Sequence, residues 1–229
     1  MLRDTDFTMM QNTHNSFITE VVDDYYDDSD VREANDAAFV FRTMEKELMS
    51  DMLPLFIKTP NGRHRCGIKR ECYKVNPMMV NSDWMKCYQF IGALIGRNMI
   101  KDHLWFGMPL APTFWMLSKD EKPTLKDYAK EDARLQKRLN KFAADDFEEE
   151  FWVWTDSADE VLPLIEDGKD IAVTSENLAD FQAALLDKLI GEGAEQTENM
   201  KKGIAHTLGD MDYLREYLNW HDVMVLAET

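Results

Sequence analysis

Residues 53–63 read Leu53-Pro54-Leu55-Phe56-Ile57-Lys58-Thr59-Pro60-Asn61-Gly62-Arg63. The apolar run over 53–57 is typical of a short extended segment. Thr59 to Arg63 bring proline, asparagine and glycine together, which is a strong turn signal. A second break follows at Asn76-Pro77. The stretch therefore predicts a short extended segment closed by a turn.

Helical patterns lie on both sides of this stretch. Before it, one apolar stripe recurs every three or four residues through Ala38, Phe41, Met44, Leu48 and Met52. After it, residues 84–100 carry apolar side chains over more than one face, which predicts a central, buried helix capped by Ser82 and Asp83. Gly92 and Gly96 lie four residues apart on this helix and would let a neighbouring element approach closely.

The remaining chain alternates helices with a few short strands. Thr174-Ser175-Glu176-Asn177 has the composition of a helix cap. Helices are expected over 114–117, 130–143, 178–190, 197–208 and 211–218, and extended segments over 151–154, 161–165 and 171–173. The fold class is therefore α+β, mainly helical, with its strands between about 147 and 173.

The chain is acidic: 26 Lys and Arg stand against 43 Asp and Glu in 229 residues, a formal net charge of -17. Such a surface repels nucleic-acid phosphates and anionic lipids, so neither nucleic acid nor membrane is an expected partner. It favours either a partner with a basic face or simple solubility. The acidic run Asp23 to Asp28 is typical of a solvated loop. We see no signal peptide and no stretch of 18 uncharged apolar residues.

Cys66, Cys72 and Cys87 are a sparse, odd set of cysteines. They indicate reduced thiols and an intracellular protein, cytoplasmic or nuclear. His64 with the three cysteines lacks the paired spacing of a zinc site, so we expect no metal. No phosphate-binding glycine loop or Ser/His/Asp arrangement is evident, and we expect no cofactor.

Several segments have a distinctive order along the chain. After residues 53–63 come Arg70-Glu71-Cys72-Tyr73 with Asn76-Pro77, Tyr88-Gln89-Phe90-Ile91-Gly92-Ala93-Leu94-Ile95-Gly96, Leu110-Ala111-Pro112-Thr113-Phe114-Trp115, Ile171-Ala172-Val173-Thr174-Ser175-Glu176-Asn177, and Glu195-Gln196 through Met200-Lys201-Lys202-Gly203. Together they span roughly residues 35–225. In this order they resemble the N-terminal lobe (N-lobe) of a HECT-type ubiquitin ligase, closest in pattern to the large HERC-type ligases. The glycine pair usual in that family before its first long helix has no counterpart at Asp28 to Glu33.

The resemblance implies an architecture and a role. It implies a larger helical subdomain, about 1–120 and 174–229, and a small inserted subdomain, about 121–173, that pivots and binds a ubiquitin-conjugating enzyme (E2). The parent would be a ubiquitin transferase, with ubiquitin and its own C-terminal lobe (C-lobe) as further partners. The C-lobe, with its T-C-F nucleophile motif, does not follow Val223 to Leu226 in this sequence. The chain alone is therefore expected to be inactive, with no catalytic residue.

The resemblance also implies the residues of an E2-binding groove. The residues carried over are Leu135, Leu139, Phe147, Phe151, Phe181 and Leu185. Leu135 and Leu139 lie one turn apart on a charged helix, and a groove awaiting a partner must leave them partly exposed. The alternative is that all of these residues are ordinary core residues.

Other functions remain open on the sequence. The chain could be a fragment of an active transferase, or a stand-alone, non-catalytic module that binds E2 or ubiquitin. It could also be an acidic helical scaffold unrelated to ubiquitin.

Overall fold

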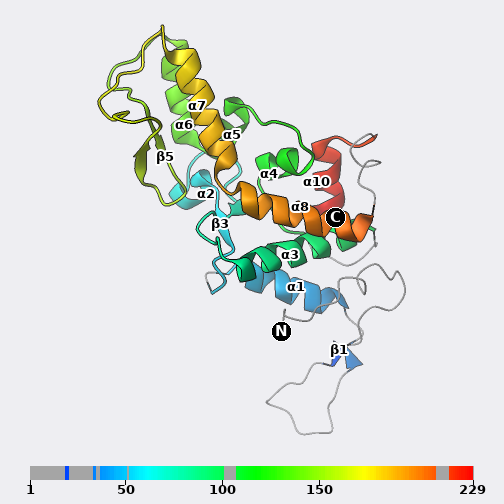
Figure 1. Cartoon of the computed structure of the whole chain (residues 1–229). Helices are drawn as coiled ribbons and strands as arrows, with labels where there is room; N and C mark the ends of the chain where they lie inside the picture. The colour runs from blue at the N-terminus through cyan, green and yellow to red at the C-terminus, as the bar shows by residue number, and fades with distance from the viewer. Residues whose placement is uncertain are drawn as a thin grey trace. The chain divides into compact units, whose positions relative to one another are not determined.

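The computed structural model describes residues 19–20, 33–34, 37–50, 52–100, 107–209 and 217–228 (Figure 1). The acidic run 23–28 and most of the helix expected over 211–218 lie outside these residues. The fold is mainly helical with short antiparallel strand pairs, so the predicted α+β class is confirmed. None of the helices in the described part combines the length and apolarity that a bilayer crossing needs.

The chain divides into two compact units. Unit 1 comprises residues 1–55, 81–108 and 198–229, and unit 2 comprises residues 56–80 and 109–197. The insert expected over 121–173 lies within unit 2, which also includes 56–80 and 174–197. The proposed subdomain boundaries therefore remain a prediction.

Unit 1 is built around helix α3 (Ser82–Ile100). Residues 91–98 of α3 are all buried, which confirms the predicted central helix. Its cap differs from the prediction, because the Asn81 side chain accepts the N–H groups of Asp83 and Trp84. The other elements of this unit are β1 (Thr19–Glu20), β2 (Glu33–Ala34), α1 (Ala37–Leu48), most of α8 (Ala194–Leu208) and α10 (Trp220–Glu228).

Helices α3 and α8 cross at glycines, as predicted for Gly92 and Gly96. A Cβ on Gly92 would fall on the Met200 carbonyl, and one on Gly203 would fall on the Gln89 carbonyl. No larger residue fits at this crossing without separating the backbones. The close packing buries Met200 and other apolar residues of α8 against α3.

Unit 2 begins with a strand pair and a one-turn helix. Strand β3 (Phe56–Lys58) pairs antiparallel with β4 (Tyr73–Val75), with Phe56 opposite Val75. The turn expected at 59–63 is the short helix α2 (Pro60–His64), because Pro60 starts a helical turn that Thr59 caps. Helices α4 (Pro112–Ser118), α5 (Leu125–Glu131) and α6 (Ala133–Ala143) follow.

The second half of unit 2 is a hairpin and a long helix. Strands β5 (Val153–Thr155) and β6 (Val161–Pro163) pair antiparallel, and α7 (Leu178–Gly191) follows. Phe151 and Ala172 form an isolated bridge, so the piece expected over 171–173 contributes one pair rather than a strand. Figure 1 shows α5, α6 and α7 side by side. Their shared core contains Phe142, Trp152, Val173, Phe181 and Leu185.

Candidate functional site

Helix α6 carries two of the predicted docking residues, and its first turn is fixed from two directions. The Asp132 side chain caps the helix by accepting the Arg134 N–H. The Asn61 amide oxygen accepts the Ala133 N–H at 2.7 Å. Asp132 also breaks the helix expected over 130–143 into α5 and α6, because its backbone is extended. The start of α6 is thus set by residues from distant parts of unit 2.

Asn61, in the middle of the T-P-N-G-R stretch, is buried, and both the oxygen and the nitrogen of its side-chain amide are hydrogen-bonded. Its Nδ2 donates to the carbonyls of Ile68, at 2.8 Å, and Lys130, at 3.0 Å. Its oxygen also receives the Cys66 thiol. A buried amide is costly unless its donors and acceptors are satisfied, so this position depends on all of these contacts. The motif is therefore a support for the helix pair α5 and α6.

The structure brings most of the predicted docking residues into one cluster. Leu135, Phe181 and Leu185 are buried in the core of unit 2, at 9%, 0% and 3% exposure. Leu139 and Phe147 pack against this core and stay partly exposed. The expected exposure is thus found at Leu139 but not at Leu135, which faces inward. Phe181 serves as core, with Phe142 and Trp152 edge-on to its ring.

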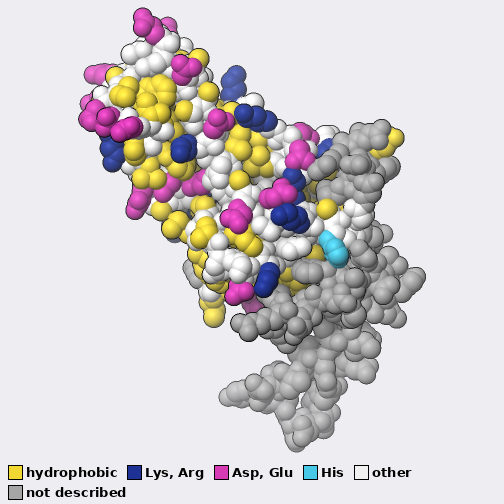
Figure 2. Space-filling model, in the orientation of Figure 1, with side chains coloured by type: hydrophobic (Ala, Val, Ile, Leu, Met, Phe, Trp, Pro, Cys, Tyr) yellow, Lys and Arg dark blue, Asp and Glu magenta, His cyan; other side chains and the backbone are white. Residues whose placement is uncertain are grey.

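Phe151 lies apart from this core and is 37% exposed. Exposed apolar side chains on the same segment include Val161, Ile165 and Ile171. Figure 2 shows hydrophobic side chains gathered over the segment between α6 and α7, bordered by acidic ones. This surface is available to a partner.

A small pocket of about 90 Å³ opens among α6, α7 and β5. We call it the α6–α7 pocket. Its lining residues are Asp132, Arg134, Leu135, Arg138, Trp154, Thr155, Leu185 and Leu189. Leu135 and Leu185 were predicted site residues. Although both side chains are buried, they line the pocket wall. Trp154, Arg138 and Leu189 were not predicted. Trp154 could have been found from its spacing to Trp152 in a segment expected to be extended, and Leu189 from its position one turn after Leu185. No sequence signal pointed to Arg138.

Arg138 ties α6 to the segment that leads into β5. Its guanidinium donates to the Glu150 carboxylate at 2.6 Å and to the carbonyls of Val153, at 2.7 Å, and Phe151, at 2.6 Å. It also stacks over the Phe181 ring, 4.6 Å from the centroid. A planar fork suits this set of acceptors better than an ammonium group would. Arg138 therefore holds the pocket wall in place.

Asp159, in the hairpin loop between β5 and β6, brings three basic side chains to one carboxylate oxygen. They are Arg134 at 2.9 Å, His64 at 3.1 Å and Arg63 at 3.2 Å. Burial raises the pKa of Asp159, but the hydrogen bonds from His64 and Arg134 and the charge of Arg63 outweigh it and lower the pKa to about 2. The hairpin that carries Trp154 is therefore anchored to α2 and α6.

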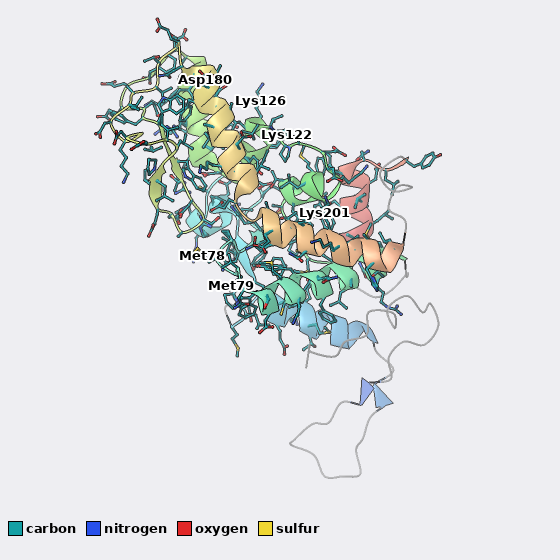
Figure 3. The ribbon with its side chains drawn as sticks, in the orientation of Figure 1. Met78, Met79, Lys122, Lys126, Asp180 and Lys201 are labelled. Atoms are coloured by element: carbon teal, nitrogen blue, oxygen red, sulfur yellow. The ribbon has the colours of Figure 1, made fainter. Side chains whose placement is uncertain are left out.

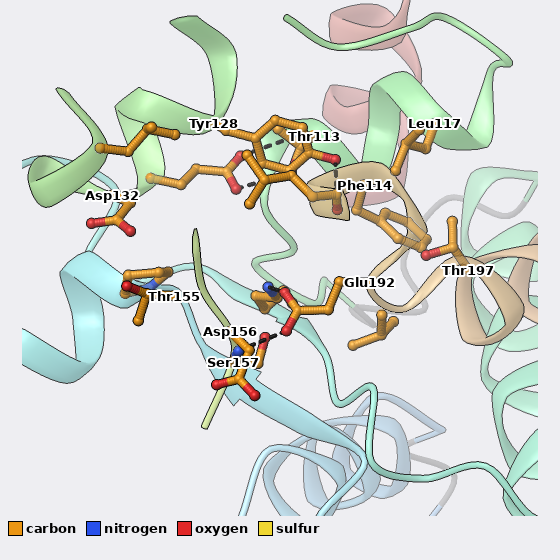
Figure 4. Close-up of a pocket in the computed structure, with 16 residues that line it drawn as sticks. Thr113, Phe114, Leu117, Tyr128, Asp132, Thr155, Asp156, Ser157, Glu192 and Thr197 are labelled. Atoms are coloured by element: carbon orange, nitrogen blue, oxygen red, sulfur yellow. Dashed lines mark hydrogen bonds and ion pairs between the residues drawn. The ribbon is translucent and has the colours of Figure 1, made fainter. Parts of the chain in front are cut away.

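A second pocket, of about 60 Å³, lies beside the first and contains a buried carboxyl (Figure 4). Glu131 accepts the Thr113 N–H at 3.0 Å and the Thr113 hydroxyl at 2.9 Å. Burial raises the pKa of Glu131 to about 7, although these hydrogen bonds oppose the shift. Across the pocket, Glu192 accepts Lys74 and the Ser157 N–H. The Glu131–Thr113 bonds join α5 to α4, and the Glu192–Ser157 bond joins the end of α7 to the hairpin. Both carboxyl groups therefore stabilise the packing of these elements.

The three cysteines form no disulfide with one another; Cys72 is buried, and Cys66 and Cys87 are partly buried. Burial and the nearby Asp83 raise the pKa of Cys87, which disfavours a thiolate. Among the described residues, no three His, Cys, Asp or Glu side chains are grouped so that they could hold a metal ion.

Comparison with known proteins places the chain in a family. The family described as HECT-domain (ubiquitin-transferase) matches residues 42–228, so this chain belongs to the HECT-domain family. Its relatives include the E3 ubiquitin-protein ligase HERC2 of Mus musculus and of Homo sapiens, each 24% identical over 168 residues. These matches cover 71% of this chain and 4% of either relative. The resemblance to HERC-type HECT domains is confirmed.

Proposed function

We propose that unit 2 is the E2-docking part of a HECT-type ubiquitin ligase. Membership of the HECT-domain family and similarity to E3 ubiquitin-protein ligases support the ubiquitin pathway. The observation that carries the docking role is the pocket that Leu135, Leu185, Leu189 and Trp154 line. An apolar, partly aromatic hollow with charged groups at its edge suits a single apolar anchor from a partner.

The proposal assigns different roles to the predicted residues. Leu139, Phe147 and Phe151 are exposed enough to touch an E2 directly. Leu135 and Leu185 form the inner wall, and Phe181 supports them from behind. Arg138 and Asp159 hold the wall and hairpin before a partner arrives, which lowers the ordering cost of binding.

In this proposal the described residues position an E2 and make no covalent bond to ubiquitin. The cysteines support this division, because Cys72 is buried, Cys66 is partly buried with its thiol on Asn61, and Cys87 has a raised pKa. A nucleophile for a thioester relay needs an exposed, activated thiolate.

Binding to a panel of E2 enzymes tests the proposal. The full chain, isotope-labelled for NMR, is titrated with each E2, free and carrying ubiquitin as a stable ester. We expect weak binding to some E2s, with the largest shifts at 135–139, 147–154 and 185–189. An E2 whose loop anchor is replaced by alanine is the matched control and should not bind. Absence of binding to every E2, or shifts confined to other surfaces, would refute the docking role.

A further inference from the structure

A basic loop stands out in this acidic chain. Residues 63–70 read Arg63-His64-Arg65-Cys66-Gly67-Ile68-Lys69-Arg70, without one acidic residue, in a chain of formal net charge -17. We call residues 64–70 the basic loop. It runs from the last residue of α2 toward β4 within unit 2, and none of its residues lines the α6–α7 pocket.

The basic loop is held in one conformation by its neighbours. The Cys66 N–H donates to the Asn61 carbonyl at 3.0 Å, and the Asn61 side chain donates to the Ile68 carbonyl. The Thr59 hydroxyl donates to the Lys69 carbonyl at 2.9 Å. These bonds tie the backbone of the loop to its neighbours, while Arg65, Ile68 and Arg70 are exposed and Lys69 is partly exposed. A loop fixed in this way loses little entropy when it binds.

Two long cationic residues of the basic loop have a backbone conformation that glycine adopts with less strain. Arg65 has φ 54° and Lys69 has φ 57°, both in the left-handed region, as does Gly67 at φ 63°. Residues with long side chains adopt this conformation at a cost. Five acidic residues elsewhere in the described chain share this conformation, and Arg65 adopts it as the C-cap of α2.

The positive charge of the loop is not neutralised by neighbouring carboxylates. Arg63 and His64 share Asp159. By contrast, Arg65, Lys69 and Arg70 have no ion-pair partner among the residues that the structure describes. Ile68 stands between these cations and is 62% exposed. The loop thus offers unpaired charge around one exposed apolar side chain.

We propose that the basic loop binds a short acidic segment of a partner protein, one that places an apolar residue on Ile68. Charge complementarity selects the acidic class, and Ile68 supplies an apolar contact. A nucleic acid would extend well beyond so short a loop and meet the repulsion of the surrounding acidic surface. The partner would engage this chain independently of an E2.

Peptide binding to the full chain tests this proposal. A fluorescent peptide with aspartates and glutamates around one leucine is compared with the same peptide carrying asparagine and glutamine, by anisotropy at two salt concentrations. The loop variant combines Arg65→Asn, Lys69→Asn and Arg70→Gln, since asparagine tolerates the left-handed positions. The control variant changes net charge equally through Lys126→Gln, Lys169→Gln and Lys202→Gln, all exposed (Lys126 is labelled in Figure 3).

We expect the loop variant to bind the acidic peptide about tenfold more weakly than the parent chain. The control variant should stay within about twofold, and Ile68→Ser should weaken binding at unchanged charge. E2 binding should be the same in all variants and none should melt lower than the parent chain, which separates this proposal from the docking role. Equal losses in both charge variants, equal binding of the amide peptide, or tighter loop-dependent binding of an RNA oligonucleotide or an anionic vesicle would overturn it.

Discussion

The amide oxygen of Asn61 lies 2.7 Å from the backbone nitrogen of Ala133, the first residue of α6. N–H groups in the first turn of a helix have no partner inside the helix, so Asn61 satisfies one of them from outside. The Asn61 Nδ2 holds the Lys130 carbonyl at the end of α5. The segment after β3 therefore fixes the junction from which the proposed docking helix starts.

Asn61→Ala should destabilise unit 2 markedly. The change removes the Asn61 side chain from three partly buried hydrogen bonds, to Ile68, Lys130 and Ala133, and we expect a loss of about 2–4 kcal/mol. Urea denaturation measures it. Asn140→Ala on α6 removes an exposed side chain whose one side-chain hydrogen bond within the described part of the chain is with Gln136, and should stay within about 0.5 kcal/mol. Similar small changes in both variants would contradict the role given to Asn61.

Gly67→Ala tests the loop beside Asn61. Gly67 has φ 63°, and an added Cβ would lie 2.6 Å from the Asn61 Nδ2. We expect a loss of at least about 1 kcal/mol from the left-handed backbone, and more if Asn61 shifts. Gly191→Ala is the control, because nothing lies within 4 Å of its Cβ and it ends α7. It should be neutral or stabilising by up to about 1 kcal/mol in thermal melting. Equal effects would show that Asn61 tolerates displacement.

Structural features that depend on the sequence of a single helix or strand were predicted well. Apolar residues on more than one face of 84–100 predicted a buried helix, and Gly92 and Gly96 predicted its close neighbour. The break at Asp132 was missed, because the helical stripe continues across it. Its extended backbone is stabilised by contacts from Asn61, about 70 residues away, which local propensity cannot reveal.

The candidate site was predicted less completely, for a related reason. Spacing placed Leu135 and Leu139 on one stripe, but a stripe has an inner and an outer edge, and only packing decides which leucine lies at each. Arg138 was not among the predicted site residues, because a cation on a charged helix gives no signal of its own. In the structure it bonds the Phe151 and Val153 carbonyls and stacks on Phe181, contacts that form only when α7 and the hairpin assemble.

Glu131→Gln should remove a pH dependence of stability. The pKa of Glu131 is raised by burial to about 7 from 4.5. Between pH 4.5 and 7 the Glu131 carboxyl keeps its proton in the folded chain and loses it in the unfolded chain. The free energy of unfolding therefore falls as the pH rises through this range, by up to about 3 kcal/mol. Glutamine keeps an acceptor for Thr113 and cannot ionise.

The measurement is the free energy of unfolding in urea at several pH values from 4 to 8. We expect the fall between about 4.5 and 7 to be smaller in Glu131→Gln than in the parent chain. Exposed Glu148→Gln is the matched control and should leave the profile unchanged. A profile in Glu131→Gln identical to that of the parent would mean that Glu131 titrates normally.

Leu135 and Leu139 allow the docking role to be separated from stability on one helix. Both lie on α6, four residues apart, and the same truncation to alanine applies to each. Leu135 is buried in the core of unit 2, whereas Leu139 packs against that core from a partly exposed position. The two variants therefore differ chiefly in burial.

Leu135→Ala should cost about 2–5 kcal/mol of stability, because it opens a cavity in a packed core. Leu139→Ala should cost less in stability and about 2 kcal/mol in E2 affinity, which is enough to abolish weak binding. Melting and E2 titration are measured on both proteins, with binding recorded well below each melting temperature. If Leu139→Ala melts near normally and no longer binds, Leu139 is a docking residue. If it lowers melting and keeps its E2 affinity, Leu139 is a core leucine, and the direct contact surface must then lie on the exposed segment around Phe151.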